Sequence, residues 1–140
     1  MKVVYVAGPI RNQSHFKRHR NILRGEEVAY ELWEMGYAAI CPHKNTEFLD
    51  GILQDYQILQ GDMELIKRSD AIVVCQYWRH SAGTMEEIHF CKESKIPVFF
   101  WEYDQHCVRN WAKDDYDIEK HVVSQVERIE RLLTAEIIML

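Results

Sequence analysis

The sequence predicts an α/β fold: a flavodoxin-like (Rossmann-like) parallel sheet of four to five strands with helices on both faces, plus a C-terminal amphipathic helix. Four short runs of apolar and β-branched residues are typical of strands buried on both faces. Each run is followed by a stretch with helical periodicity, so strands and helices alternate along the chain. Turn residues such as Gly8, Pro9 and Gly36 separate these segments. Alternation of this kind builds a parallel sheet, because each helix carries the chain back to the start of the next strand.

The bulk properties indicate one domain over residues 1–140, with a core at 1–101 and a C-terminal extension at 102–140. Hydrophobic residues make up 47% of the chain and charged residues 28%, which is ordinary for a globular protein. No apolar run approaches the roughly 18 residues of a membrane span, so we expect no membrane partner. A net charge of -5 argues against binding to a nucleic acid polymer. The four cysteines include no C-x-x-C pair, which is typical of reduced thiols in a cytoplasmic protein.

The first strand is expected over residues 2–7 and the first helix over residues 14–35. Apolar residues that recur every seven positions, with others beside them, predict the buried face of this helix. This predicted face comprises Phe16, Ile22, Leu23, Ala29, Tyr30 and Trp33.

The second strand is expected over residues 37–41, followed by a polar loop over 42–46. The next helix has an apolar stripe at steps of four and three residues, which predicts its buried face. The stripe comprises Ile52, Tyr56, Leu59, Met63 and Ile66. The remaining segments are a strand at 71–77, a helix from the turn at 81 to 94, a strand at 98–101 and a final helix at 117–134.

The stretch 81–87 (SAGTMEE) lies at the turn between the third strand and its helix. If the strand order is 2-1-3-4, it reverses between strands one and three, and the loops at 8–11 and 76–84 meet there. A small-residue turn at a helix start can bind anions, because its N–H groups are unpaired. Glu87 is expected in the first helical turn, where the positive helix end would keep its carboxylate ionised, as a nucleophile requires.

A structural interpretation of the same spacing stays open. Thr84-x-x-Glu87 fits a capping box, in which Thr84 caps the helix and Glu87 reaches back to the cap. From spacing alone capping is the commoner reason, and the convergence of the two loops is what favours function. Asp62 is also ambiguous, because a carboxylate beside a buried stripe serves either as a cap or salt-bridge partner or in a site.

Three ordered motifs resemble one known superfamily. They are residues 4–11 (VYVAGPIR), Asp62 eight residues before Asp70, and Ser81-x-Gly83-x-x-x-Glu87. Together they are similar to the nucleoside 2-deoxyribosyltransferase superfamily, which includes the 2′-deoxynucleoside 5′-monophosphate N-glycosidases. The likeness covers residues 1–101, and the loop at 42–46 (PHKNT) looks closest to small bacterial and phage members. Two departures are His89, where many members have glycine, and the segment from Tyr103 onward, to which the likeness does not extend.

The resemblance implies cleavage of a base–sugar bond through a covalent glycosyl-enzyme intermediate. Glu87 lines up with the nucleophile, Asp62 with an acid near the base, and Tyr5 with a tyrosine that touches the nucleophile, although a core tyrosine is an equally good interpretation. Members that act on 5′-monophosphates carry serine at position 81, where nucleoside-specific members tend to carry aspartate. The resemblance therefore favours hydrolysis of nucleoside 5′-monophosphates. A base-exchanging transferase and a nucleotide-binding sensor without turnover are the alternatives.

The expected substrate-binding residues lie in three loops at the same edge of the sheet. They are Gly8, Pro9, Ile10 and Arg11, then His43 and Asn45, then Trp78, Ser81, Gly83 and Thr84. Arg11 is a counter-charge for a phosphate, and Trp78 either stacks on a base or covers the core.

We expect no cofactor and no metal. His15 and His19 have the spacing of helical metal ligands, but the basic residues around them would repel a cation. The expected partners are a nucleotide or nucleoside and further copies of the chain in a homo-oligomer, a dimer or larger, because in the superfamily a neighbouring subunit often completes the site.

Overall fold

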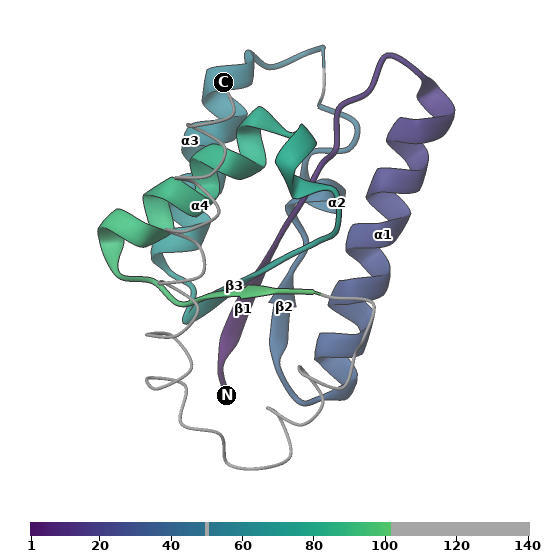
Figure 1. Cartoon of the computed structure of the whole chain (residues 1–140). Helices are drawn as coiled ribbons and strands as arrows, with labels where there is room; N and C mark the ends of the chain where they lie inside the picture. Colours follow the sequence, from purple (N-terminus) through teal and green to yellow (C-terminus); the bar gives the residue numbers. More distant parts are fainter. Residues whose placement is uncertain (50, 102–140) are drawn as a thin grey trace.

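The computed structural model describes residues 1–49 and 51–101, whose four strands form one parallel sheet in the order β2-β1-β3-β4 (Figure 1). The strands are β1 (Val3–Ala7), β2 (Ala38–Ile40), β3 (Ala71–Val74) and β4 (Val98–Phe100). In the register, Tyr5 pairs with Ile40 on one side and with Ile72 on the other. The predicted flavodoxin-like α/β fold is confirmed, and the strand order reverses between β1 and β3 as expected.

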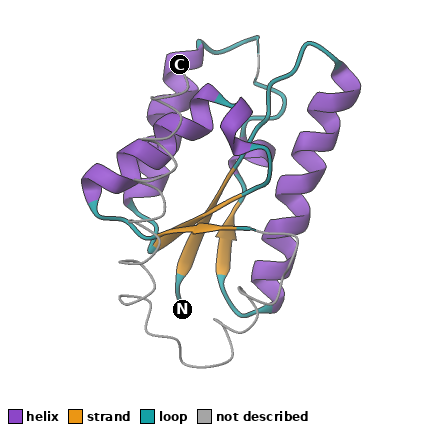
Figure 2. Ribbon diagram, in the orientation of Figure 1, coloured by secondary structure: helices purple, strands orange, loops and turns teal. Residues whose placement is uncertain are grey.

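Helices cover both faces of this sheet (Figure 2). They are α1 (His15–Glu34), α2 (Pro42–Asn45), α3 (Asp55–Lys67) and α4 (Ala82–Ser94), with a 3₁₀ turn η1 at Trp78–His80. Because side chains alternate along a strand, Val4 and Val6 of β1 pack against α1, whereas Tyr5 and Ala7 pack on the face covered by α3 and α4. This alternation places the Tyr5 side chain on the same side of the sheet as Glu87.

The bounds predicted for α1 are confirmed within a residue, but the prediction of its buried face is wrong for four of the six residues. Ser14 caps the helix by accepting a hydrogen bond from the Lys17 N–H, and Gly36 ends it with a φ of 93°. Four residues of the predicted face are exposed: Phe16, Leu23, Tyr30 and Trp33. The buried face is instead Ile22, Gly25, Val28, Ala29 and Leu32. Small residues let the helix approach its neighbours closely, and a pattern based on large apolar residues alone overlooks them.

The stripe predicted for α3 is confirmed only at its C-terminal end. Ile66 is fully buried and Met63 packs beside it, but Ile52 precedes the helix with 75% of its surface exposed, and Tyr56 is 62% exposed. The N-terminal half of α3, including Leu59, lines a pocket instead of packing on the sheet. The apolar stripe therefore comprises residues of two different surfaces, the core at its C-terminal end and the pocket wall at its N-terminal end.

Two shorter segments also differ from the predictions. The expected polar loop at 42–46 contains the short helix α2, which begins at Pro42, a residue suited to the first helical position. β3 ends at Val74 and not at 77, because the chain turns at Tyr77 with a φ of 64° and enters η1. The helix expected at 117–134 lies outside the described residues. No helix in the described ranges is long and apolar enough to cross a membrane.

Candidate active site

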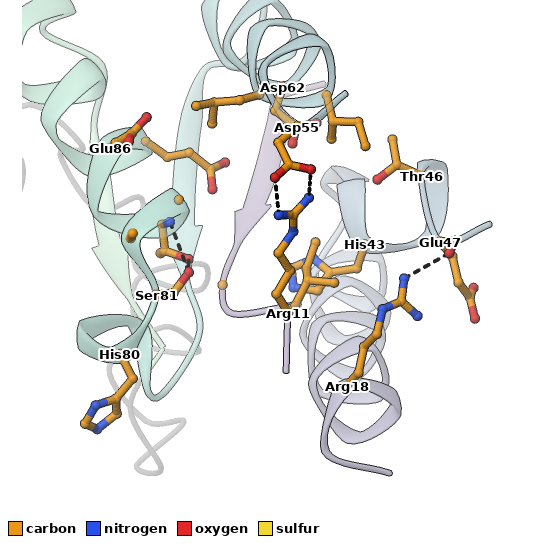
Figure 3. A pocket seen from close by; sticks show the side chains of 18 residues that line it. Arg11, Arg18, His43, Thr46, Glu47, Asp55, Asp62, His80, Ser81 and Glu86 are labelled. Atoms are coloured by element: carbon orange, nitrogen blue, oxygen red, sulfur yellow. Dashed lines mark hydrogen bonds and ion pairs between the residues drawn. The ribbon is translucent and has the colours of Figure 1, made fainter. Parts of the chain in front are cut away.

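A pocket of about 460 Å³ opens at the carboxyl ends of β1 and β3 (Figure 3), a size typical of small-molecule sites. Its wall comes from the loop after β1, α2 and the segment after it, the N-terminal half of α3, and the turn leading into α4. Nine of the sequence-predicted site residues line it: Gly8, Ile10, Arg11, His43, Asp62, Ser81, Gly83, Thr84 and Glu87. The two loops that the sequence analysis expected to meet therefore do so.

Four predicted site residues are not in the described pocket wall. Tyr5 lies behind it, fully buried in the core. Pro9 takes part through its backbone carbonyl, which accepts a hydrogen bond from His43. Asn45 is exposed at the end of α2, and the Trp78 ring packs against Phe100 with their centroids 5.1 Å apart.

The capping-box interpretation of Thr84 and Glu87 is wrong. Ser81 is the N-cap of α4, and its Oγ accepts hydrogen bonds from the Thr84 N–H at 3.2 Å and from the Thr84 hydroxyl at 2.9 Å. Because the helix begins at Ala82, Thr84 is its third residue, and Glu87 is its sixth, in the second turn. Glu87 is therefore too far along the helix to reach back to the cap.

The expectation that the helix end keeps Glu87 ionised is also wrong. Glu87 is only 7% exposed, and this burial raises the pKa of its carboxyl to about 8. The nearby Tyr5 hydroxyl lowers this pKa, whereas the charges of Asp62 and Glu86 raise it further. Since the helix dipole falls off after the first turn, burial dominates, and Glu87 is mostly protonated at neutral pH.

Tyr5 faces Glu87 from β1. Its hydroxyl is buried, and its pKa is raised well above the ordinary value by burial and then by the Glu87 and Asp62 charges. Although the two side chains are close enough to shift each other's pKa, neither Tyr5 Oη nor Glu87 Oε2 completes a hydrogen bond of normal geometry within the described chain. Tyr5 therefore stays protonated and can donate to the Glu87 carboxylate when that group ionises.

Asp62 supplies a second carboxyl group on the α3 side of the pocket (Figure 3). It is half-buried, and desolvation raises its pKa to about 6. Asp62 and Glu87 therefore form a pair of carboxyl groups with separate pKa values, and the pair carries one proton between about pH 6 and pH 8.

The start of α4 provides an anion-binding feature at the other end of the pocket. The backbone N–H groups of Ala82 and Gly83 have no acceptor within the helix, because they belong to its first turn. Gly83 lines the pocket, and apart from its chain neighbours and the backbone of its own helix no described heavy atom lies within 4 Å of where a Cβ would stand there. The Thr84 N–H, expected to join them, is occupied by Ser81.

His43 is buried between the loop after β1 and helix α1, and it contributes almost no exposed surface to the pocket. It is 1% exposed, and its Nε2 lies 3.1 Å from the Pro9 carbonyl oxygen. Because a carbonyl only accepts, Nε2 carries the proton and donates it. Burial lowers the pKa of the ring to about 4, so His43 is neutral. The ring packs against Gly25 of α1 and thereby fixes the Gly8–Pro9 turn at the pocket floor.

Gly8 packs so closely against Cys75 that a larger side chain there is expected to destabilise the protein. A Cβ at Gly8 would lie 2.8 Å from the Cys75 Cβ, so Gly8→Ala is expected to lower the free energy of unfolding by about 1–3 kcal/mol. Gly61→Ala, inside α3 with open space around it, is the matched control and should raise it by about 0.5–1 kcal/mol. Urea unfolding measures both changes, and equal effects of the two substitutions would contradict the close contact.

Several pocket residues are not among those predicted from the sequence. They are Arg18, Thr46, Glu47, Asp55, Ile58, Leu59, His80, Ala82 and Glu86. One signal was present: Asp55 precedes Asp62 by seven residues, which puts both carboxylates on one face of α3. Among the described residues, no group of three or more His, Cys, Asp or Glu side chains is arranged to hold a metal ion.

Comparisons with known proteins agree with this architecture. Residues 2–100 match a family model described as "Domain of unknown function (DUF4406)". Among solved structures, the fold is similar to a 2-deoxyribosyltransferase from the psychrotolerant bacterium Bacillus psychrosaccharolyticus, with a TM-score of 0.50, 19% sequence identity and coverage of 70% of both chains. No curated protein matches the sequence. The expected likeness to the nucleoside 2-deoxyribosyltransferase superfamily is thus confirmed for the fold.

Proposed function

Because the chain belongs to the family of unknown function DUF4406 and has a 2-deoxyribosyltransferase-like fold, we propose that it cleaves the base–sugar bond of nucleoside 5′-monophosphates. The observation that carries this proposal is the buried Glu87 carboxyl, which opens onto the pocket beside Asp62 and in front of Tyr5. Placing a carboxyl at such a site costs stability, which is typical of a group retained for chemistry.

The proposed reaction uses Glu87 as the nucleophile. Its carboxylate attacks the anomeric carbon, the bond from this carbon to the base nitrogen breaks, and the electron pair stays on the base. Between about pH 6 and pH 8 the two carboxyl groups share one proton, and the reactive form is the one in which Asp62 holds it and Glu87 is ionised. Asp62 gives this proton to the departing base. The positive charge that develops on the sugar favours the ionised form of Glu87, and the Tyr5 hydroxyl donates to it.

The second step releases the sugar. Water attacks the anomeric carbon of the glycosyl ester, Asp62 takes a proton from this water, and the Glu87 carboxylate leaves. The products are free base and sugar 5-phosphate, and both carboxyl groups return to their starting states. A free base in place of water would give a new nucleotide, which is the transferase alternative. The structural relative is a 2-deoxyribosyltransferase, which favours that alternative. Ser81 favours the monophosphate hydrolase.

The start of α4 is proposed to hold the substrate's phosphate. Ser81 and the N–H groups of Ala82 and Gly83 are aligned with the positive end of the helix, and Arg11 lines the same pocket. From Gly83 to Glu87 the helix rises by about 6 Å, at roughly 1.5 Å per residue. This rise is comparable with the span of a pentose from its 5′ oxygen to its anomeric carbon. One helix therefore aligns the phosphate end and the reacting carbon.

The test is base release from a panel of ribo- and deoxyribonucleosides and their 5′-monophosphates, followed by chromatography, with and without a second free base. We expect free base from monophosphates alone. Ser81→Asp is the informative variant, because aspartate also caps helices but repels a phosphate. It should raise KM for monophosphates about tenfold or more and leave α4 folded. Equal release from nucleosides and monophosphates by the unmodified protein would refute the phosphate site.

The panel also distinguishes the alternatives. A new nucleoside or nucleotide formed from the added base would identify a transferase. Ligand that binds tightly and is recovered intact would identify a sensor without turnover.

A further inference from the structure

An ion pair between Arg11 and Asp55 spans the pocket (Figure 3). Both carboxylate oxygens of Asp55 accept hydrogen bonds from the guanidinium, one from Nη1 and one from Nη2. Arg11 belongs to the loop after β1, whereas Asp55 is the first residue of α3, 44 positions further along the chain. The pair therefore joins two separate parts of the pocket wall.

The pair has the properties of an exchangeable contact. The two side chains are 56% and 70% exposed, and exposed ion pairs contribute little to stability because water solvates both partners when they separate. The hydrogen bond from Arg11 also lowers the pKa of Asp55, so Asp55 is a carboxylate at neutral pH. A stronger anion can therefore take the guanidinium from Asp55 without disturbing the core.

A phosphate at the start of α4 is such an anion. A guanidinium binds carboxylate and phosphate oxygens with the same two-pronged geometry, so the two groups compete for one face of Arg11. A phosphate monoester carries between one and two negative charges near neutral pH, and the N–H groups of Ala82 and Gly83 line the same pocket. Asp55 carries the same sign of charge as the phosphate and would repel it.

We propose that Asp55 is a specificity-determining residue that competes with the substrate's 5′-phosphate for Arg11. Asp55 accepts both hydrogen bonds from the guanidinium, and phosphate binding displaces it. Asp55 thereby sets how strongly the pocket holds the phosphate end of its ligand. This inference rests on the phosphate-binding part of the proposed function, and not on the chemistry at Glu87.

Asp55 could weaken phosphate binding through its negative charge alone or by competing for Arg11, and the experiment must separate the two effects. Other carboxyl groups also line the pocket and would repel a phosphate: Glu47, Asp62, Glu86 and Glu87. Glu86→Gln is the matched control. Glu86 is exposed on α4 and lines the same pocket, and no described contact joins it to Arg11. Its substitution by glutamine therefore removes one negative charge from the pocket and leaves the ion pair in place. Asp55→Asn, in contrast, removes the charge and the competing ligand together.

The experiment is calorimetric titration of the full-length protein with ribose 5-phosphate and with ribose, neither of which has a base to release. We expect Asp55→Asn to bind ribose 5-phosphate about five- to twentyfold tighter, Glu86→Gln to change it less than about threefold, and ribose binding to stay the same. In an Arg11→Ala background, Asp55→Asn should lose most of its gain. Thermal unfolding checks that α3 tolerates the substitution.

Unchanged or weaker binding by Asp55→Asn would overturn the inference, since it would mean that Asp55 orients Arg11 for the ligand or plays no part. An equal gain from Glu86→Gln would overturn it as well, by showing that net charge is the cause. Base release from monophosphates combined with either result would leave the proposed function standing. A gain for Asp55→Asn in a protein that releases no base would support the competition and refute the glycosidase.

Discussion

Glu87→Gln is expected to lower the rate of base release from the best monophosphate substrate by on the order of 10³-fold or more. Glutamine keeps the size of the side chain but cannot form the glycosyl ester. The loss should appear in kcat, because the phosphate is proposed to bind at the start of α4 and not at this carboxyl. Single-turnover assays with chromatographic detection of free base measure it. Glu93→Gln, an exposed residue on the same helix, is the control and should keep the full rate.

The same substitution should stabilise the protein, with a defined pH dependence. The folded-state pKa of Glu87, about 8, lies above its ordinary value of 4.5, so the folded protein favours the protonated carboxyl. That stability is fully present below about pH 4.5 and is lost as pH rises through about 8. Glutamine has no charge to bury, so the thermal midpoint of Glu87→Gln should exceed that of the unmodified protein more at pH 8 than at pH 5.

A gain in stability together with a loss of activity is the pattern expected of a functional group held in an unfavourable place. If Glu87→Gln released base at the full rate, Glu87 would not be the nucleophile. A loss of stability at pH 8 would show instead that the carboxylate makes a favourable contact in the fold.

Asp62→Asn is expected to lower kcat by about 10²- to 10⁴-fold, because the base then departs without a proton. The deficit should shrink for a substrate analogue with a leaving group that is stable as an anion. Comparing the two kinds of substrate by steady-state kinetics measures this difference. Glu64→Gln, an exposed residue two positions along α3, is the matched control. An equal deficit on both substrates would exclude proton donation by Asp62.

The pH dependence of kcat/KM is a second measurement that tests the role of Asp62 through Asp62→Asn. The Asp62–Glu87 pair titrates in two steps, near pH 6 and near pH 8, and the reaction needs one proton on the pair. A bell-shaped profile with its maximum between these values is expected. In Asp62→Asn the rate should instead rise with pH and level off once Glu87 is ionised. A retained alkaline decline would assign that limb to another group.

The sequence by itself determined the order of the elements and which loops meet at the pocket. Apolar runs that alternate with helical periods specify a parallel sheet, and the chirality of its crossovers leaves few strand orders. From the reversal of that order, the loops after β1 and β3 were expected to meet, and they line one pocket with Arg11, Asp62, Ser81 and Glu87. These features follow from local patterns and from general rules of chain topology.

Tertiary structure decided the features that depend on neighbours distant in the chain. The buried face of α1 is set by Gly25 against His43, not by the large residues Phe16 and Tyr30. Helix position and burial together give the Glu87 carboxyl a pKa of about 8, where the sequence suggested an ionised group. The contact between Arg11 and Asp55 joins segments 44 residues apart. Desolvation and charge pairing act through space, so no local pattern in the sequence encodes them.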